Sequence, residues 1–488
     1  MDLLLIIPPY HRRLGSGVIF PLGLGYIAAV AERAGFSVSI LDCAAQCHSL
    51  DKPHIKQFEM WLRGLLPNMP PRIAIGIGPC TTSALRGIQI VADICKSVFP
   101  NIPLIFGGPL VGLPDSNALF LNQFKADAVV LGDGEVAIAG ILNGLMSGSS
   151  LDELPGVVTS SVSKLPNIVT DLDDLPFPNR DALILSPDYR LSIRRDLFRN
   201  PFATIMASRG CPHHCDFCIS GSSRNGVYSR RSIRNIILEM KYLVEQCGIR
   251  TVVFYDDCFF PSATHLENDV LEFTTQLNML ALDINWEIEM RPEVVYALNS
   301  TLANTLYLSG CRQINIGIET ANMGLSAVLG KPANPELLRK SLSQIKRGAP
   351  ALRLTGTFIL GGPGETEDTI AQTVEYAKSL GLLFAHFYPL EIYPGTKLYE
   401  SIYGIIPADW LYQRVISDDL PWGEIIYENQ FLSRDSLLAM VNQAYNKFYN
   451  DSCWHNTAVQ FLGSNYSSIA GRISMWINDR FNLRSSIV

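Results

Sequence analysis

The sequence predicts an α/β protein that has an N-terminal doubly wound parallel sheet, a partial (β/α)6 barrel and a mostly helical C-terminal domain. Apolar strands alternate with helices over roughly the first 145 residues, and the alternation resumes with a longer repeat at residue 203. Such alternation is typical of parallel sheets whose faces are covered by helices. The 488 residues are 48% hydrophobic and 17% charged, whereas ordinary domains are about 25% charged. The chain can therefore bury large cores.

The net charge and the hydrophobic segments exclude several classes of protein. The 39 basic and 46 acidic residues give a net charge of −7, which argues against a nucleic-acid binder. The apolar run Leu3–Ile7 stops at Pro8-Pro9 and no basic residue precedes it. It is too short for a signal peptide or a membrane span. We expect no transmembrane segment and a cytoplasmic location, and a peripheral membrane role stays open.

The N-terminal domain is expected to be a sheet with ligand-binding loops at one edge. Its strands are expected at residues 2–7, 37–41, 72–77, 103–106 and 127–131, with helices at 21–34, 54–65 and 83–98. The loops after these strands contain mostly Gly, Pro, Ser and Thr, and ligands of such sheets bind beyond the carboxyl ends of the strands. These loops suit a large, flat or phosphate-bearing ligand that approaches the backbone closely.

The second half of the chain is expected to form the barrel, in which function lies on the loops after the strands. Its strands are expected at 203–207, 250–255, 285–289, 313–318, 354–360 and 384–390, and its helices at 232–246, 263–279, 294–308, 335–347 and 367–380. The predicted divisions are a sheet domain at 1–148, an acidic, proline-rich connector at 149–200, the barrel at 201–400 and a helical domain at 401–488.

Three of the eleven cysteines lie together after the first barrel strand, as Cys211-x3-Cys215-x2-Cys218. Thiolates favour zinc or iron–sulfur clusters. A structural zinc site needs a fourth ligand, which His213 or His214 could supply, so a zinc-stabilised, non-catalytic binding protein remains an alternative. Three cysteines alone fit a four-iron cluster with one iron open. The scattered cysteines do not indicate a disulfide framework.

The cysteine motif, with Phe217 before its last residue, resembles the signature of the radical S-adenosylmethionine (SAM) enzymes. The resemblance implies that the three cysteines bind a 4Fe-4S cluster whose open iron chelates SAM. An electron from an external flavodoxin- or ferredoxin-like donor then cleaves SAM to a 5′-deoxyadenosyl radical. Fragments after the later strands agree with the family over roughly 200–400. The SAM-binding residues that we expect are Phe217, Asp256, Arg291, Glu319, Gly361 and Gly362.

Two of these residues have a physical role that can be stated in advance. Arg291 could pair with the carboxylate of SAM, and Glu319 could accept hydrogen bonds from ribose hydroxyls. An ion pair elsewhere or a helix cap is an equally good interpretation of each. Glu365 is expected to be an N-terminal helix residue, where a carboxylate is favoured.

The segment 1–145 resembles the cobalamin-binding domain that is fused to one branch of these enzymes. The expected cobalamin-binding residues are Pro9, Gly15, Gly17, Gly23, Gly78, Cys80, Thr81, Gly107, Gly108, Gly132, Gly134 and Glu135. Cys80 is interpreted as a thiolate ligand or, with better reason, as a small buried residue. A generic doubly wound domain that lost its ligand or binds a nucleotide is the alternative.

One motif departs from the classical cobalamin-binding pattern Asp-x-His-x-x-Gly. After Asp42 the first histidine is His48, which is at the wrong spacing and has no Gly in the required place. The lower face of cobalt is therefore expected to be open or water-bound.

Together the two resemblances imply a class B radical SAM methyltransferase that methylates an unactivated carbon of a small-molecule, natural-product or peptide substrate. One SAM would methylate cobalamin and a second would generate the radical, and the substrate radical would take the methyl group from methylcobalamin. Rearrangement, cyclisation or oxidation, with cobalamin in another role or absent, is the alternative. His386 and Tyr388 are expected to face the barrel interior and contact the substrate.

Overall fold

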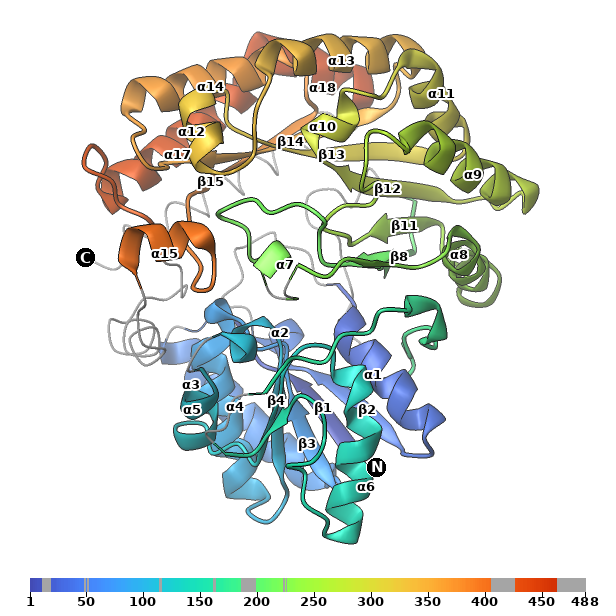
Figure 1. Ribbon diagram of the computed structural model, residues 1–488, viewed down its shortest axis with the longest axis vertical. Helices are drawn as coiled ribbons and strands as arrows, with labels where there is room; N and C mark the ends of the chain where they lie inside the picture. The colour runs from blue at the N-terminus through green and yellow to red at the C-terminus, as the bar shows by residue number, and fades with distance from the viewer. Residues whose placement is uncertain are drawn as a thin grey trace. The chain divides into compact units, whose positions relative to one another are not determined.

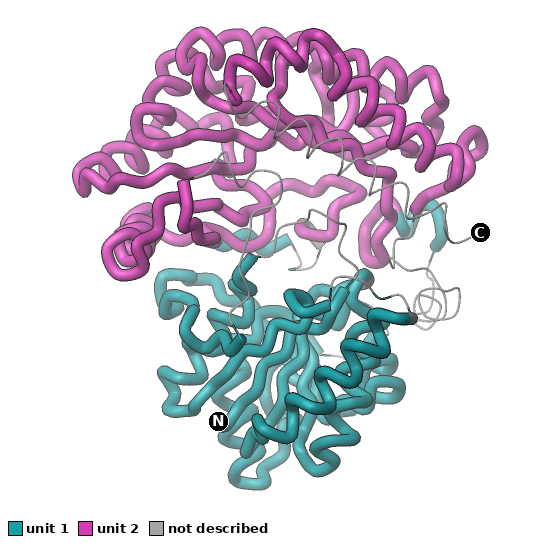
Figure 2. The backbone as a smooth tube through the Cα atoms, turned by 180° about the vertical axis from the view of Figure 1, so that it is seen from behind, with its two compact units in different colours: residues 1–190, 222–229, 399–424 teal, residues 191–221, 230–398, 425–488 magenta. Residues whose placement is uncertain are grey.

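The computed structural model describes residues 1–10, 19–47, 50, 52–113, 116–160, 164–185, 199–222, 224, 226–404 and 426–462. The chain divides into two compact units (Figure 2). The N-terminal unit comprises Met1–Arg190, Ser222–Ser229 and Tyr399–Glu424. The barrel unit comprises Leu191–Gly221, Arg230–Leu398 and Ile425–Val488. Among the described helices, none has the length and the apolar character that a membrane crossing requires.

The N-terminal unit is built on a seven-stranded sheet with the order β6-β5-β4-β3-β1-β2-β7. The strands are β1 (Leu3–Ile7), β2 (Val38–Asp42), β3 (Ala74–Ile77), β4 (Leu104–Gly107), β5 (Ala128–Val130), β6 (Val157–Val158) and β7 (Leu183–Ile184). All neighbours are parallel except β5 and β6. The strand order reverses between β1 and β3, which is where sheets of this type bind their ligands.

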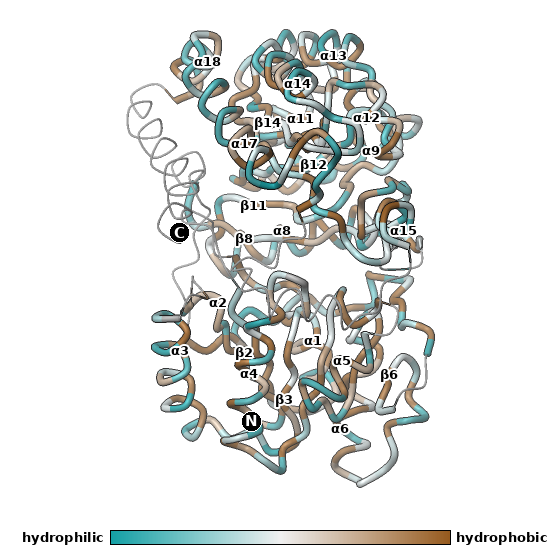
Figure 3. Tube along the Cα trace, turned by 90° about the vertical axis from the view of Figure 1, so that its left-hand side faces the viewer, coloured by the Kyte–Doolittle hydropathy of each residue, from teal (hydrophilic) through white to brown (hydrophobic). Residues whose placement is uncertain are grey.

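Helices cover both faces of this sheet. Figure 1 shows α1 (Leu22–Arg33) and α6 (Ile138–Ser147) on one face, and α3 (Lys52–Leu65), α4 (Leu85–Val98) and α5 (Ser116–Asn122) on the other. The short helix α2 (Cys43–Gln46) follows β2. All five residues of β1 are buried, and the strands appear as hydrophobic stretches in Figure 3. Burial on both faces explains why these strands have continuous apolar sequences. The predicted doubly wound sheet is confirmed.

Both edges of the sheet come from the segment that the sequence marked as a connector. β6 pairs antiparallel with β5, and β7 pairs parallel with β2. Residues 167–169 lie along the loop after β5, where Asn167 N donates to Leu131 O at 2.9 Å and Asp133 N donates to Asn167 O at 2.8 Å. Strands of two residues are too short to show the period of two that identifies a strand in a sequence.

The carboxylate of Asp133 joins three distant segments of the N-terminal unit. It accepts from Val169 N at 2.7 Å and from Arg224 Nη1, which lies 2.6 Å from both of its oxygens. Arg224 Nη2 also donates to Val169 O at 3.1 Å. The two side chains are only 9% and 12% exposed. Arg224 follows the last cysteine of the motif by six residues, and no sequence pattern marks it.

The barrel unit contains an open, six-stranded parallel sheet with the order β15-β14-β13-β12-β11-β8. Its strands are β8 (Phe202–Ile205), β11 (Thr251–Phe254), β12 (Asn285–Met290), β13 (Cys311–Glu319), β14 (Arg353–Leu360) and β15 (Phe384–Pro389), and the short strands β9 (Ser208–Arg209) and β10 (Ser229–Arg230) lie outside it. All six predicted barrel strands are present, and the partial (β/α)6 barrel is confirmed.

Helices follow the strands of the barrel, and further helices come after the last strand in the chain. They are α7 (Ile219–Ser222), α8 (Ile233–Cys247), α9 (Leu266–Met279), α10 (Pro292–Val295), α11 (Ser300–Leu308), α12 (Met323–Val328), α13 (Pro335–Gly348), α14 (Glu367–Ser379), α15 (Lys397–Tyr403), α17 (Arg434–Tyr449) and α18 (Ser452–Leu462). The single helix expected at 294–308 is two helices, because the Asn299 side chain accepts from Leu302 N and begins α11.

Side chains of the C-terminal helices hydrogen-bond to the outer edge of the sheet. Tyr445 Oη accepts from Phe387 N at 3.1 Å, and Tyr449 Oη both accepts from Ala385 N at 3.2 Å and donates to Ala385 O at 3.0 Å. Trp454 Nε1 donates to Leu383 O at 2.9 Å. An edge strand normally presents a row of such groups to other chains. Here side chains of α17 and α18 hydrogen-bond to the backbone groups at and next to the edge strand β15.

Replacing Tyr449 with phenylalanine is expected to lower the free energy of unfolding by about 1–3 kcal/mol, because the N–H and C=O of Ala385 lose a buried partner. The measurement is urea unfolding followed by circular dichroism. The control is Tyr255→Phe, since Tyr255 is 57% exposed and its change should stay within about 0.5 kcal/mol. Equal effects of the two substitutions would contradict this role of Tyr449.

Candidate functional site

The three cysteines of the motif lie on one loop of the barrel unit that follows β8 and β9. Cys211 is buried, Cys215 and Cys218 are half-buried, and none of the three is in a disulfide. The loop is fixed by Asp216, which follows the second cysteine, because Asp216 N donates to Leu329 O at 3.0 Å and Asp216 O accepts from Leu398 N at 2.8 Å. Gly330 has φ +62°, and a Cβ there would come within 3.0 Å of Asp216. The turn after α12 therefore has to be glycine for the cysteine loop to seat on it.

The buried carboxylate of Asp256 fixes the chain just before this loop. It accepts from Ala207 N at 3.2 Å and from Ser208 Oγ at 2.6 Å. Burial raises the pKa of Asp256 to about 6, although these hydrogen bonds favour the charged form. The structure thus gives Asp256 a role in shaping the strand end, and SAM binding by this residue stays a prediction.

Arg291 extends from the end of β12 to the cysteine loop. Its Nη1 lies 2.9 Å from Cys215 Sγ, and its Nη2 lies 3.0 Å from Glu293 Oε1. Burial by itself lowers the pKa of Arg291, but the charges of Cys215 and Glu293 outweigh it and raise the pKa. Arg291 therefore stays charged, and it faces a sulfur atom of the motif.

The donor set of the loop fits an iron–sulfur cluster chemically. A hydrogen bond from the Cys258 thiol lowers the pKa of Cys211, and the neighbouring His213 N–H and Arg291 charge act in the same direction, whereas burial raises the pKa of Cys218. Thiolates are the ligands that such clusters require. Within the described residues, however, no three His, Cys, Asp or Glu side chains are already arranged around a common point. Metal binding commonly completes the arrangement of its ligands.

Glu319, at the end of β13, forms a buried ion pair that the sequence did not indicate. Its Oε1 accepts from Lys331 Nζ at 2.6 Å, and the two side chains are 11% and 8% exposed. Glu319 has φ +65°, a conformation rare for a residue with a side chain. Such strain is common at functional sites. Lys331 contacts only Oε1 of the carboxylate, and the contact of Glu319 with a ribose stays a prediction.

The Gly361-Gly362 turn after β14 is closed by Glu365. Glu365 Oε2 accepts from Gly361 N at 2.6 Å and from Gly362 N at 3.0 Å. The helix α14 begins later, with Thr366 as its N-cap, so the expectation that Glu365 lies in the helix is wrong. A Cβ on Gly362 would meet Leu325 at 2.3 Å. The close packing of Leu325 explains why position 362 is a glycine. A role of Gly362 in SAM binding stays a prediction.

A pH dependence of stability follows from Glu365. Burial raises its pKa from the usual 4.5 to about 7, although the two amide donors oppose this shift. Between these values the folded chain keeps the proton and the unfolded chain loses it, so the free energy of unfolding falls as the pH rises. As the pH rises from about 4.5 to 7, the free energy of unfolding of Glu365→Gln should increase relative to that of the wild type by up to about 3 kcal/mol. Urea unfolding at both ends of this range measures the difference, and a constant difference would contradict the prediction.

His386 and Tyr388 lie on the face of the barrel sheet that carries polar residues. On β14, Thr357 lies opposite His386 and Ile359 lies opposite Tyr388, and the same face of β14 carries Thr355 beside Asn315 of β13. The alternate residues Ala385 and Phe387 are buried, and Phe387 packs on Tyr445 of α17. The two rings stack with centroids 6.2 Å apart and planes at 26°. Tyr388 is 37% exposed. Their contact with a substrate stays a prediction.

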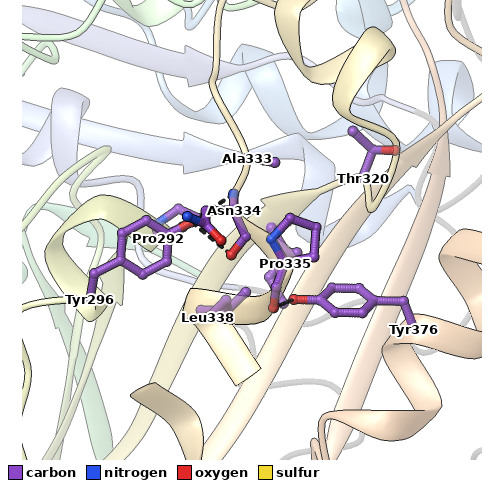
Figure 4. A pocket seen from close by; sticks show the side chains of 9 residues that line it. Pro292, Tyr296, Thr320, Ala333, Asn334, Pro335, Leu338 and Tyr376 are labelled. Carbon is purple, nitrogen blue, oxygen red and sulfur yellow. Dashed lines mark hydrogen bonds between the residues drawn. The ribbon is translucent and has the colours of Figure 1, made fainter. Parts of the chain in front are cut away.

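A small cavity in the barrel unit lies beside α10, α13 and α14. Figure 4 shows Tyr296 and Tyr376 on its wall, each directed at the start of α13. Tyr376 Oη donates to Pro335 O at 2.8 Å, and Tyr296 Oη accepts from Asn334 N at 3.1 Å. The cavity measures about 10 Å³, which is roughly the space for one water. It is too small for an organic substrate.

In the N-terminal unit, the loops after β3 and β4 are joined at the carboxyl edge of the sheet. Cys80 N donates to Gly107 O at 2.9 Å, and Leu110 N donates to Cys80 O at 3.0 Å. Gly108 has φ +133°, and a Cβ there would meet Cys80 N at 2.3 Å. Cys80 is fully buried, burial raises its pKa, and its thiol donates to Ile77 O at 3.6 Å. These facts favour the interpretation of Cys80 as a small packing residue.

The other expected cobalamin-binding residues lie around the same edge where they are described. Thr81 Oγ1 lies 3.2 Å from Ser83 Oγ, Gly23 at the start of α1 is exposed, and Glu135 is buried. Gly132 has φ +77° against Asn167. Pro9 is buried, and a Cβ on Gly87 would meet its carbonyl oxygen at 1.8 Å. Gly15, Gly17 and His48 lie outside the described residues. The small residues at this edge fit a ligand that contacts the backbone.

Two family models match two separate parts of the chain. Residues 205–377 match the radical SAM superfamily, and residues 15–142 match the B12 binding domain. The first contains the cysteine motif, Arg291 and Glu319, and the second contains all the expected cobalamin-binding residues apart from Pro9.

Relatives and solved structures resemble most of the chain. An uncharacterised methyltransferase of Pyrococcus horikoshii is 28% identical over 82% of this chain and 83% of its own. Cytidylyl-2-hydroxyethylphosphonate methyltransferase of Streptomyces wedmorensis is 22% identical over 78% and 77%. The radical SAM methyltransferase TsrM of Kitasatospora setae, solved with tryptophan and a SAM analogue, has a TM-score of 0.71 at 15% identity and covers 100% and 99%. A second TsrM structure, with cobalamin and a [4Fe-4S] cluster, has a TM-score of 0.69 at 16% identity, covering 99% and 100%. This chain therefore shares its fold with both TsrM structures.

Proposed function

Because the chain belongs to the radical SAM enzymes that carry a B12-binding domain, we propose that it is a cobalamin-dependent methyltransferase that acts on an unactivated carbon atom. The cofactors would be a 4Fe-4S cluster, SAM and cobalamin, and the electron donor would be a flavodoxin- or ferredoxin-like protein. The substrate would be a small molecule, a natural product or a peptide. The observation that carries the proposal is the presence, in one chain, of a three-cysteine loop at a barrel strand end and a doubly wound sheet with small residues at its ligand edge.

The residues of the barrel unit have definite tasks in this proposal. Cys211, Cys215 and Cys218 hold the cluster, and Asp256 fixes the strand end that leads into their loop. Arg291 keeps a positive charge at the sulfur of Cys215. With its cofactors bound, such a site supplies a carbon-centred radical and a transferable methyl group. The polar face that carries His386 and Tyr388 would orient the substrate so that one C–H bond is directed to the radical.

The residues of the N-terminal unit would hold the corrin through backbone contacts. The switch point between β1 and β3 lies where the loops at residues 8–10 and 78–82 begin, and ligands of such sheets bind there. Cys80 does not supply a thiolate, because it is fully buried and hydrogen-bonded to Ile77 O. Its task is to join the loops after β3 and β4 through its backbone.

The first experiment is anaerobic purification and reconstitution with iron, sulfide and cobalamin, followed by metal analysis and visible absorption. We expect about four irons, as one such cluster contains, and about one corrin per chain. Adding SAM and a reductant should then give 5′-deoxyadenosine when a substrate is present. Deuterated methyl-SAM would show by mass spectrometry whether the product carries a new methyl group on carbon.

Each other outcome of this experiment would point to a different function. Four irons without corrin would remove the cobalamin mechanism. Corrin and iron with a rearranged, unmethylated product would favour the alternative radical chemistry. Zinc in place of iron would overturn the radical SAM assignment of the site.

A further inference from the structure

The contact between Arg291 and Cys215 differs from the role that the sequence suggested for this arginine. A clamp for the SAM carboxylate would direct the guanidinium fork at an open position. Instead, one arm of the fork points at the Cys215 sulfur at 2.9 Å and the other at Glu293 Oε1 at 3.0 Å. The Arg291 side chain is 10% exposed, and the Glu293 side chain is 33% exposed. The fork is thus occupied by a sulfur of the motif and a carboxylate.

A charged donor at a ligand sulfur changes how readily an iron–sulfur cluster is reduced. Reduction adds one negative charge, and hydrogen bonds to the sulfurs and nearby positive charges stabilise that charge. The interaction is strong at a buried site because little water screens it. Resting on the function proposed above, we propose that Arg291 is a positioning residue that raises the reduction potential of the cluster through its N–H···S contact with Cys215, and that Glu293 limits this effect.

The geometry of Glu293 supports the second part of this proposal. Its Oε1 pairs with Arg291, while its Oε2 is buried and has no hydrogen-bond partner among the described residues. The carboxylate therefore offsets part of the guanidinium charge from two residues further along the chain. Arg291 and Glu293 form a charge pair in which only the cation touches the sulfur. Removing the cation and removing the anion should therefore shift the potential in opposite directions.

The test is a redox titration of the reconstituted cluster, followed by electron paramagnetic resonance without SAM or substrate. The proteins compared are the wild type, Arg291→Gln, Arg291→Lys and Glu293→Gln. The matched control is Arg199→Gln, since Arg199 pairs with Asp283 at an exposed position. Iron and sulfide are counted in each protein first, so that only chains with a complete cluster are compared.

For Arg291→Gln we expect the ratio of reduced to oxidised cluster at a fixed potential to fall about tenfold, which is about 59 mV for a one-electron couple. The ratio for Arg291→Lys should lie between the ratios for Arg291→Gln and the wild type, because lysine keeps the charge without the planar fork. Glu293→Gln should shift the ratio upward, and Arg199→Gln should leave it unchanged.

An unchanged potential in Arg291→Gln, or a shift of both variants in the same direction, would overturn the inference. If Arg291→Gln binds no iron, the potential of Glu293→Gln still tests the inference, because Arg291 is unchanged in that variant. An upward shift of this potential is expected. A wild-type protein that binds no iron would instead contradict the proposed function itself.

Discussion

Replacing Cys215 with serine is expected to abolish iron binding, so that bound iron falls from about four atoms to less than one per chain. Cys215 is the cysteine whose sulfur contacts Arg291, and a serine hydroxyl does not provide the thiolate that a cluster needs. Cleavage of SAM should fall by more than the 10–100-fold that is typical when only an outer partner of a metal ligand is lost. Iron analysis and the yield of 5′-deoxyadenosine measure the two effects.

The matched control for this substitution is Cys247→Ser. Cys247 is an exposed residue at the end of α8, so its removal tests for non-specific loss of iron from surface thiols. It should retain the iron content of the wild type. A Cys215→Ser protein with all its iron would show that the motif does not hold the cluster, while bound zinc in the wild type would favour the binding-protein alternative.

Replacing Lys331 with methionine is expected to lower the free energy of unfolding by about 3–5 kcal/mol, the usual cost of removing one partner of a buried ion pair. Lys331 is buried and its Nζ lies 2.6 Å from Glu319 Oε1. Without it, Glu319 keeps a buried charge at a backbone position that is already strained, with φ +65°. The loss should appear in urea unfolding as a lower midpoint with an unchanged slope.

A double variant separates the charge effect from a packing defect. Glu319→Gln in the Lys331→Met background removes the uncompensated charge and should recover much of the lost stability, since a buried pair without charges is often tolerated. The single substitutions are therefore expected to be strongly non-additive. Additive losses would show that Lys331 acts through packing alone.

The alternation of strands and helices could be predicted from the sequence because it depends on local patterns. Strands such as β1 are continuously apolar since both of their faces are covered, and α8, α13 and α14 begin at Ser232, Asn334 and Thr366, which have typical capping side chains. The cysteine motif was visible for a similar reason, because its three residues lie within eight positions of the chain.

The contacts that the sequence did not reveal are those made between distant segments. Lys331 lies twelve residues from Glu319, and Tyr449 lies 64 residues from Ala385. Neither lysine nor tyrosine has a spacing that indicates its partner. Glu365 shows the same difficulty at short range. A carboxylate just before a helix can accept hydrogen bonds from the first turn of the helix or from the preceding turn. Only the backbone geometry of Gly361 and Gly362 decides between the two.

The path of the chain through the two units limits how the protein can be divided. The N-terminal unit includes Ser222–Ser229 as well as Met1–Arg190. A chain truncated after residue 190 would keep Asp133 and Val169 but lose Arg224, which supplies the cation that both of them contact. A barrel fragment that starts at residue 191 would carry Arg224 without its acceptors. A single cut therefore does not separate the two units, because the N-terminal unit also takes Ser222–Ser229 and Tyr399–Glu424 from the later part of the chain.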